Sequence, residues 1–143
     1  MGNDPFGHQV VRNLKKEKVK TKLVKFKAKQ TPISSILLTP KGERTIINYR
    51  SDADLLQMNS NVRREMKRRD WFVLFSLARC PKKDKINFLR QAKKNGQKIF
   101  LSLHGIEYLK GFDYLKDYFP YCDILHLNAH ELADIFGANA SDF

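Results

Sequence analysis

The chain has 143 residues, and its 27 Lys and Arg against 15 Asp and Glu give a formal net charge of +12 at pH 7. This length fits one domain, or part of one if the fold is a large sheet. The longest apolar run, Trp71 to Ala78, is shorter than the roughly 18 residues that a membrane span needs, and the N-terminus lacks the features of a secretory signal. The only cysteines, Cys80 and Cys122, have no neighbouring Cys or His at metal-ligand spacing. We therefore expect a reduced, cytoplasmic protein without a membrane partner.

Lysine dominates the stretch from residue 15 to residue 29, where it alternates with apolar residues. The lysines of this stretch are Lys15, Lys16, Lys18, Lys20, Lys22, Lys25, Lys27 and Lys29. Such interleaving is typical of the exposed side of amphipathic elements, so we expect a solvated surface. A surface for nucleic acid is the alternative that this charge leaves open.

The first half of the chain contains a clear helix start. Asp4 can cap free backbone N–H groups, and Pro5 loses no hydrogen bond at the first helical position. Phe6, Val10 and Leu14 then form one apolar stripe. The elements expected in this half are a helix from Pro5 to about Lys18, strands at Leu23–Phe26, Ile33–Thr39 and Thr45–Tyr49, a turn at Pro40–Glu43, and a polar helix within Asp52–Arg69.

The second half alternates apolar strands with helices. The run from Trp71 to Leu77 is almost unbroken, as expected of a strand that is covered on both faces. The expected order is a strand at 71–77, a helix at 81–95, a strand at 98–103, a helical segment within 108–118, a strand at 124–127 and a helix from 128 to 137. This alternation predicts a parallel, doubly wound α/β sheet, with no linker that separates two domains.

Asn128 and Glu131 follow the last strand, and they are the best candidates for a functional site. Ligands of an open parallel sheet bind beyond the carboxyl ends of its strands, where helix N-termini present N–H groups to anions. Residues three apart face the same side of a helix start. The pair could form a capping box, in which each side chain satisfies the backbone N–H of the other, or it could hold a ligand or metal.

Four stretches, in order, resemble the ribokinase (PfkB-type) carbohydrate kinase family. They are Met1–Gly7 with its Gly-x-Asp-x-x-Gly turn, the paired strands between Thr31 and Arg50, the mid-sheet strand Lys98–Leu103, and the Asp-strand-Asn-x-x-Glu motif from Asp123 to Leu132. The resemblance implies part of a ribokinase-like α/β domain over residues 1–143. Its doubly wound, mostly parallel core would lie at residues 71–143, and residues 31–50 would form the strands of a small β lid.

The resemblance also implies a reaction, which is transfer of the γ-phosphoryl group of ATP to a sugar hydroxyl with ATP and Mg²⁺ as cofactors. Glu131, assisted by Asn128, would project into a phosphate-sized crevice and orient the hydrated Mg²⁺, an ion that keeps several waters and uses few carboxylates. The partners would be ATP and a sugar or nucleoside whose identity stays open. Lid strands can pair across subunits, so a homodimer is also possible.

Two of the family's motifs do not occur in this sequence. The Gly-Gly region lies upstream of the Gly-x-Asp turn in the family, and the Gly-Ala-Gly-Asp segment, which supplies the general base, lies downstream of Asn-x-x-Glu. Ser102-Leu103-His104 stands where the family often has an Asp-Pro-Asn-like turn. We therefore assign no catalytic residue and expect no kinase activity from residues 1–143 alone. The alternative function is a non-catalytic basic module that binds nucleic acid or a protein.

Four further expectations concern other residues. His126 and His130 have helical spacing, but a strand–helix junction separates them, so we do not expect a zinc site. Ser76 and Ser102 lack a Gly-x-Ser-x-Gly elbow, which argues against a hydrolase nucleophile. Arg44 and Arg50 either approach substrate from the lid or are exposed strand cations. Apolar faces left without neighbouring strands, such as that of Trp71–Leu77, predict a marginally stable or aggregating chain.

Overall fold

The computed structural model describes residues 1–49, 57–77, 80–105, 107–137 and 139. Its contacts divide the chain into two compact units, Met1–Asp54 and Leu55–Phe143, and we describe each unit by itself. The sequence indicates no such boundary, because apolar periodicity does not show which elements share a core. No helix in the described ranges is long and apolar enough to cross a membrane.

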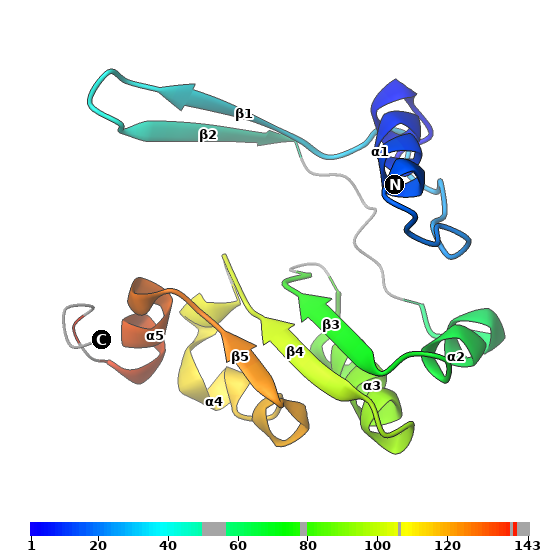
Figure 1. The fold of residues 1–143 in the computed structure, drawn as a ribbon. Coiled ribbons are helices and arrows are strands. Elements are labelled where there is room, and N and C mark those ends of the chain that lie inside the picture. The colour runs from blue at the N-terminus through cyan, green and yellow to red at the C-terminus, as the bar shows by residue number, and fades with distance from the viewer. Residues whose placement is uncertain (50–56, 78–79, 106, 138, 140–143) are drawn as a thin grey trace. The chain divides into compact units, whose positions relative to one another are not determined.

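The first unit contains helix α1 (Pro5–Lys16) and a hairpin of β1 (Ile33–Leu38) and β2 (Arg44–Tyr49), shown in Figure 1. Asp4 caps α1 as expected, and its side chain accepts the N–H of Gly7 at 2.7 Å. The helix ends at Lys16, where we had expected Lys18. Lys18 adopts a φ of 58°, in the left-handed region where a helix cannot continue.

Asp4 has a second role in the Gly-x-Asp-x-x-Gly turn. Its carboxylate accepts the N–H of Thr31 at 2.5 Å and the Thr31 hydroxyl at 2.7 Å, which ties the helix start to the residues before β1. The N–H of Gly7, followed by the hydroxyl and N–H of Thr31, lowers the pKa of Asp4. A Cβ on Gly2 would lie 2.1 Å from the backbone nitrogen of Thr31, so only glycine fits there.

The hairpin confirms the two expected strands and the turn between them. β1 and β2 pair antiparallel from Ile33 opposite Tyr49 to Leu38 opposite Arg44, and all of their residues are exposed. The expected strand at Leu23–Phe26 is wrong. That segment is a loop, fixed by an isolated bridge between Gly2 and Ala28 in place of a strand ladder.

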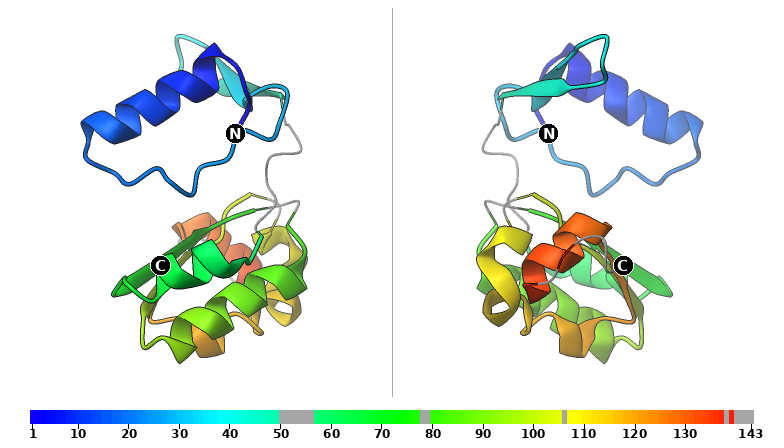
Figure 2. Two further views of the ribbon diagram at one scale, coloured as in Figure 1. Left: turned by 90° about the vertical axis from the view of Figure 1, so that its right-hand side faces the viewer. Right: turned by 90° about the vertical axis from the view of Figure 1, so that its left-hand side faces the viewer.

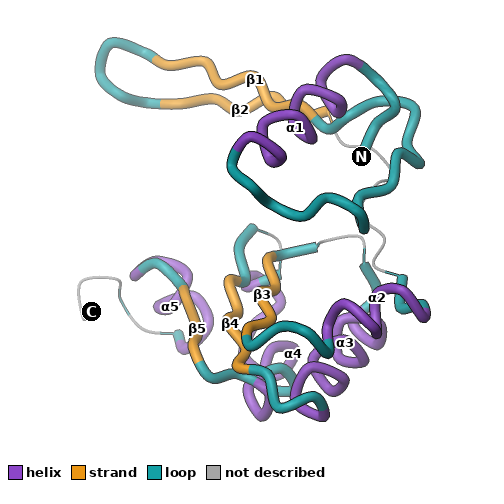
Figure 3. Tube along the Cα trace, turned by 45° about the vertical axis from the view of Figure 1, so that its right-hand side comes forward, coloured by secondary structure: helices purple, strands orange, loops and turns teal. Residues whose placement is uncertain are grey.

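The second unit is a three-stranded parallel sheet with helices, as expected of the alternating pattern (Figures 2 and 3). The strand order is β3-β4-β5, and β4 is central. Its elements are α2 (Ser60–Met66), β3 (Trp71–Phe75), α3 (Lys82–Lys94), β4 (Lys98–Ser102), η1 (Tyr108–Lys110), α4 (Gly111–Leu115), η2 (Phe119–Tyr121), β5 (Ile124–His126) and α5 (Ala129–Phe136).

The core of this unit lies against one face of the sheet. Leu74, Ile99 and Leu101 point into it and meet residues of the helices, among them Leu89 and Leu115. Trp71, Val73 and Phe75 are 50%, 49% and 60% exposed on the other face. The expectation that this strand is covered on both faces is therefore wrong, whereas the expected exposure of an apolar strand face is confirmed.

The expected helix within Asp52–Arg69 is shorter than the pattern indicates. Its first part lies outside the described residues, and α2 covers only Ser60–Met66. Asn59 determines where α2 begins, because its extended backbone cannot be helical and its side chain accepts the N–H of Val62.

Candidate functional site

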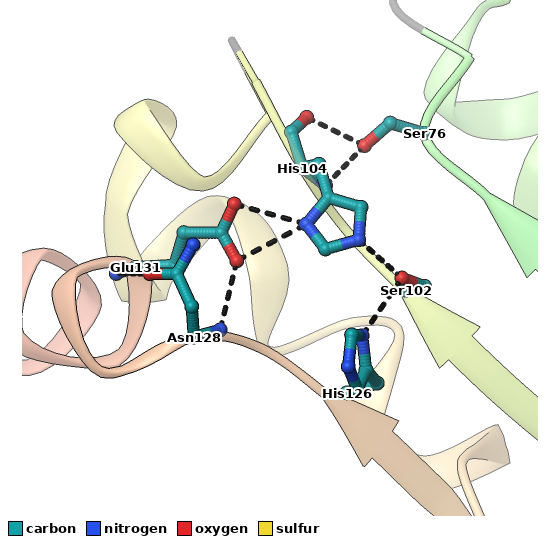
Figure 4. Close-up of polar contacts among 6 residues, drawn as sticks. All are labelled: Ser76, Ser102, His104, His126, Asn128 and Glu131. Carbon is teal, nitrogen blue, oxygen red and sulfur yellow. Dashed lines mark hydrogen bonds and ion pairs between the residues drawn. The ribbon is translucent and has the colours of Figure 1, made fainter. Parts of the chain in front are cut away.

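Asn128 and Glu131 lie together beyond the carboxyl end of β5, where the sequence placed them. Asn128 is the N-cap of α5 and accepts the N–H of Glu131 at 2.9 Å, while the Glu131 carboxylate accepts the N–H of Asn128 at 3.0 Å (Figure 4). The pair therefore forms the capping box that was one of its two interpretations. Gly137, with a φ of 68°, ends this helix as expected.

His104 is a site residue to which sequence reasoning gave no role. It follows β4, and its Nδ1 lies 2.9 Å and 3.1 Å from the two carboxylate oxygens of Glu131 (Figure 4). A carboxylate only accepts hydrogen bonds, so Nδ1 carries the proton in this contact. The signal in the sequence was the departure at Ser102-Leu103-His104 from the turn that the family often has.

Ser102 and His126 continue this contact along the strand ends. The Ser102 hydroxyl lies 2.5 Å from Nε2 of His104 and 3.2 Å from Nδ1 of His126. The Ser102 hydroxyl, which can both donate and accept, therefore bridges the rings of His104 and His126. A chain of hydrogen bonds thus joins exposed His126 to buried Glu131.

The backbone around His104 is fixed from the neighbouring strand. Ser76, just after β3, accepts the N–H of His104 at 2.5 Å and donates to the carbonyl of the same residue at 2.6 Å. The Ser76 hydroxyl is therefore hydrogen-bonded to both the N–H and the carbonyl of His104. Ser102 is 1% exposed. Neither hydroxyl is placed as an accessible nucleophile, in agreement with the absence of an elbow motif.

A buried ion pair lies beside this network. Lys85 of α3 and Glu107, before η1, are 1% and 0% exposed and are hydrogen-bonded to each other. Lys85 also donates to the carbonyl of Leu77 at 3.2 Å, and Glu107 accepts the N–H of Leu77 at 3.3 Å. The pair thereby ties the segment after β3 to the segment after β4, on which His104 lies.

Asp123, which begins the Asp-strand-Asn-x-x-Glu motif, serves the other end of the sheet. Its carboxylate accepts Lys93 at 2.7 Å and the N–H of Ile99 at 2.8 Å. Lys93 first, and then the Ile99 N–H, lowers the pKa of Asp123. The residue fastens the start of β5 to α3 and β4, so its role in the motif is structural.

The Glu131 carboxylate points toward the strand ends, as expected, but it does not project freely into a crevice. It is 6% exposed and is hydrogen-bonded to His104. The described residues hold no cluster of three His, Cys, Asp or Glu side chains that could cage a metal. The donor set of one carboxylate and one amide fits an ion that keeps its own waters and contacts few protein groups, as Mg²⁺ does.

The remaining predicted residues are Arg44, Arg50 and His130. Arg44 is exposed on β2 of the first unit, and Arg50 lies outside the described residues. His130 is exposed on α5, and no zinc site is formed with His126 among the described residues.

A family model described as "pfkB family carbohydrate kinase" matches residues 1–142 of the chain. The chain belongs to the PfkB family. A comparison of the chain with curated proteins found no match.

Solved structures show the ribokinase-like α/β fold of this PfkB chain. A ribokinase from Arabidopsis thaliana, complexed with ribose and ATP, has a TM-score of 0.74 at 19% identity over 96% of this chain and 44% of its own. A ribokinase from Giardia lamblia has a TM-score of 0.72 at 14% identity, over 97% and 42%. A fructokinase from Xylella fastidiosa has 0.72 at 20% identity, over 99% and 48%. The chain thus spans less than half the length of these structures.

Proposed function

We propose that this chain supplies Asn128 and Glu131 to a kinase that transfers the γ-phosphoryl group of ATP to a sugar hydroxyl. The catalytic Gly-Ala-Gly-Asp segment does not occur in residues 1–143, so the active polypeptide would include that segment as well. Membership of the PfkB family and the ribose and ATP bound to the Arabidopsis ribokinase support the choice of substrates. The partners would be ATP and a small sugar, in the cytoplasm.

The observation that carries this proposal is the fixed position of Glu131. Its carboxylate is held at the carboxyl ends of parallel strands and in the first turn of a helix, which is the place where such sheets bind phosphates. Asn128 and His104 hold it from two sides. Little of its orientation therefore has to be fixed when a ligand arrives.

Phosphoryl transfer depends mainly on positioning and on neutralising phosphate charge. When bound, Mg²⁺ would supply positive charge that offsets the charge of the phosphates. Glu131 would accept a hydrogen bond from one of the ion's waters through the second lone pair of Oε1, since each carboxylate oxygen has two and Oε1 contacts only His104. The backbone N–H groups at the start of α5 would face the anion.

The test is kinetic and uses the polypeptide that includes the Gly-Ala-Gly-Asp segment, with ribose and fructose as substrates. We expect Glu131→Gln to lower kcat about 10- to 100-fold, as removal of a group that orients a metal's ligands does, and to raise the Mg²⁺ concentration at half-maximal rate. Asp134→Asn, on the same helix but exposed, is the matched control. Unchanged Mg²⁺ kinetics in Glu131→Gln would reject the proposal.

A further inference from the structure

Residues 15–29, which we call the lysine segment, form the most charged surface of the first unit. All eight of its lysines are exposed. Glu17 is the only acidic residue between Asp4 and Glu43. Residues 1–49 contain 11 Lys and Arg against three Asp and Glu, so this unit carries most of the net charge of the chain.

The lysines of the second unit are used differently. Lys82, Lys93 and Lys116 lie 2.7 Å, 2.7 Å and 2.8 Å from the carboxylates of Asp117, Asp123 and Asp113. Six lysines of the lysine segment form no ion pair within the part of the chain that the structure describes, namely Lys15, Lys16, Lys18, Lys20, Lys25 and Lys29. Their charges are available to an anion from outside the chain.

The lysine segment is held in place by the N-terminal residues. The amino group of Met1 donates to the carbonyl of Lys25 at 3.0 Å, and the Met1 carbonyl accepts the N–H groups of Lys27 and Ala28 at 3.1 Å. The N–H of Val19 donates to the carbonyl of Leu14 at 2.9 Å, which fixes the other end to α1. A row of charges that is already fixed loses less conformational entropy on binding than a free basic tail does.

Two features favour a linear polyanion with bases over other anions. From Lys16 onward, the lysines follow one another at every second or third position, which suits a chain of repeated phosphates better than a single compact anion. His8 and Phe26 are exposed and stacked on each other with ring centroids 4.5 Å apart, so aromatic surface lies within the charged region.

We propose that the lysine segment, with His8 and Phe26, is a binding surface for single-stranded nucleic acid. The lysines contact successive phosphates, and the aromatic pair stacks on a base, which is the combination that sequence-tolerant single-strand binders use. All of the residues in this proposal belong to the first unit, and none of them is used in the proposed kinase function.

The test is fluorescence anisotropy of a labelled oligothymidylate of about 20 nucleotides, longer than a typical single-strand site, titrated with residues 1–143. We expect binding that weakens steeply between about 50 and 200 mM salt. Lys18→Gln, Lys20→Gln and Lys25→Gln together should lower the affinity about tenfold and reduce the slope of log K against log salt by about 2. Phe26→Leu should lower the affinity and leave that slope unchanged.

The matched control removes three charges from the second unit with Lys67→Gln, Lys83→Gln and Lys94→Gln, all at exposed positions. Wild-type affinity in this control supports the proposal. An equal loss in both triple variants, or no binding by the wild type, overturns it. Equally tight binding to a DNA duplex, or to vesicles of phosphatidylserine and phosphatidylcholine in equal parts, also overturns it, because the stacking surface would then have no role.

Discussion

At the residue scale, Asn128 and Glu131 form a capping box, and in the proposed site the same atoms would have a second role. Their side chains satisfy two backbone N–H groups at the start of α5, and they are also the candidate contacts to hydrated Mg²⁺. A substitution of either residue therefore changes stability and function together. The two effects separate only with variants that keep one role and remove the other.

Asn128→Ala removes the cap of α5, and we expect it to destabilise the chain by about 1 kcal/mol, the usual cost of losing such a side chain. Asn128→Ser keeps an acceptor at the N-cap and is the matched control, with stability close to that of the wild type. Urea unfolding followed by circular dichroism measures both variants. Equal stability of Asn128→Ala and the wild type would mean that the capping hydrogen bonds do not stabilise the helix.

Asp4 gives a prediction about pH. Its pKa is lowered in the folded chain by the N–H of Gly7 and by Thr31, so its carboxylate stabilises the fold above its ordinary pKa of 3.8. This contribution is lost as pH falls through the lowered pKa. Asp4→Asn should therefore reduce stability at pH 7 and have a shrinking effect as pH falls below about 4.

Thermal unfolding of wild type and Asp4→Asn from pH 7 to pH 2.5 measures whether the stability difference shrinks as pH falls. Exposed Asp134→Asn is the control. A stability difference that grows toward low pH would contradict the assignment.

His104 shows why part of the site could not be predicted at this scale. Asn128 and Glu131 are three residues apart, so their contact follows from helix geometry. His104 and Glu131 are 27 residues apart, and their contact depends on the parallel register of β4 and β5. That register is a property of the folded sheet, and no local pattern contains it.

At the scale of elements, α3 contains a buried lysine, Lys85, that the sequence pattern does not distinguish from its exposed lysines. The helix is rich in lysine, and Lys85 looks like any other exposed cation until Glu107 is placed against it. Burying both charges costs free energy that their attraction only partly returns. The hydrogen bonds to the Leu77 backbone give the pair a structural use, since they join the segments that follow β3 and β4.

Lys85→Met should destabilise the chain by about 3–5 kcal/mol, because it leaves the Glu107 carboxylate buried without a counter-charge. Adding Glu107→Leu should recover part of this loss, because the unpaired charge is then gone as well. A double-mutant cycle by urea unfolding measures the coupling. Additive losses would show that the two side chains do not act as a pair.

The elements themselves were predictable to different degrees. The three parallel strands and the limits of α5 follow from apolar runs and from cap residues such as Asn128 and Gly137. The false strand at Leu23–Phe26 came from apolar residues between lysines, in a segment whose backbone bonds instead to residues 1–3. Residues 1–3, to which this backbone bonds, show no strand pattern in the sequence.

At the scale of the whole molecule, large apolar side chains remain exposed in both units. Trp71, Val73 and Phe75 form one such face of β3, and Leu38 in the hairpin is 71% exposed. Unpaired strand edges and apolar faces of this kind promote association. The chain also spans less than half the length of the ribokinases and fructokinase that share its fold.

We expect residues 1–143 to self-associate as their concentration rises, in sedimentation velocity experiments, and to unfold over a broad temperature range. Val73→Thr with Phe75→Thr should reduce the association that depends on the β3 face, because both substitutions keep strand propensity and remove apolar surface. Ile36→Thr with Ile46→Thr, opposite each other in the hairpin, tests a homodimer through β1 and β2. A monomer with a sharp cooperative melt would contradict both predictions.

The most direct test of the proposed site is a nuclear magnetic resonance titration of ¹⁵N-labelled residues 1–143 with ATP, with and without Mg²⁺. We predict chemical shift changes for the backbone amides of Asn128 to Leu132 and of His104 that are larger with Mg²⁺ present and are reduced in Glu131→Gln. Unchanged chemical shifts of these amides, or chemical shift changes that do not depend on Mg²⁺, would contradict a role for Glu131 in binding the magnesium–nucleotide complex.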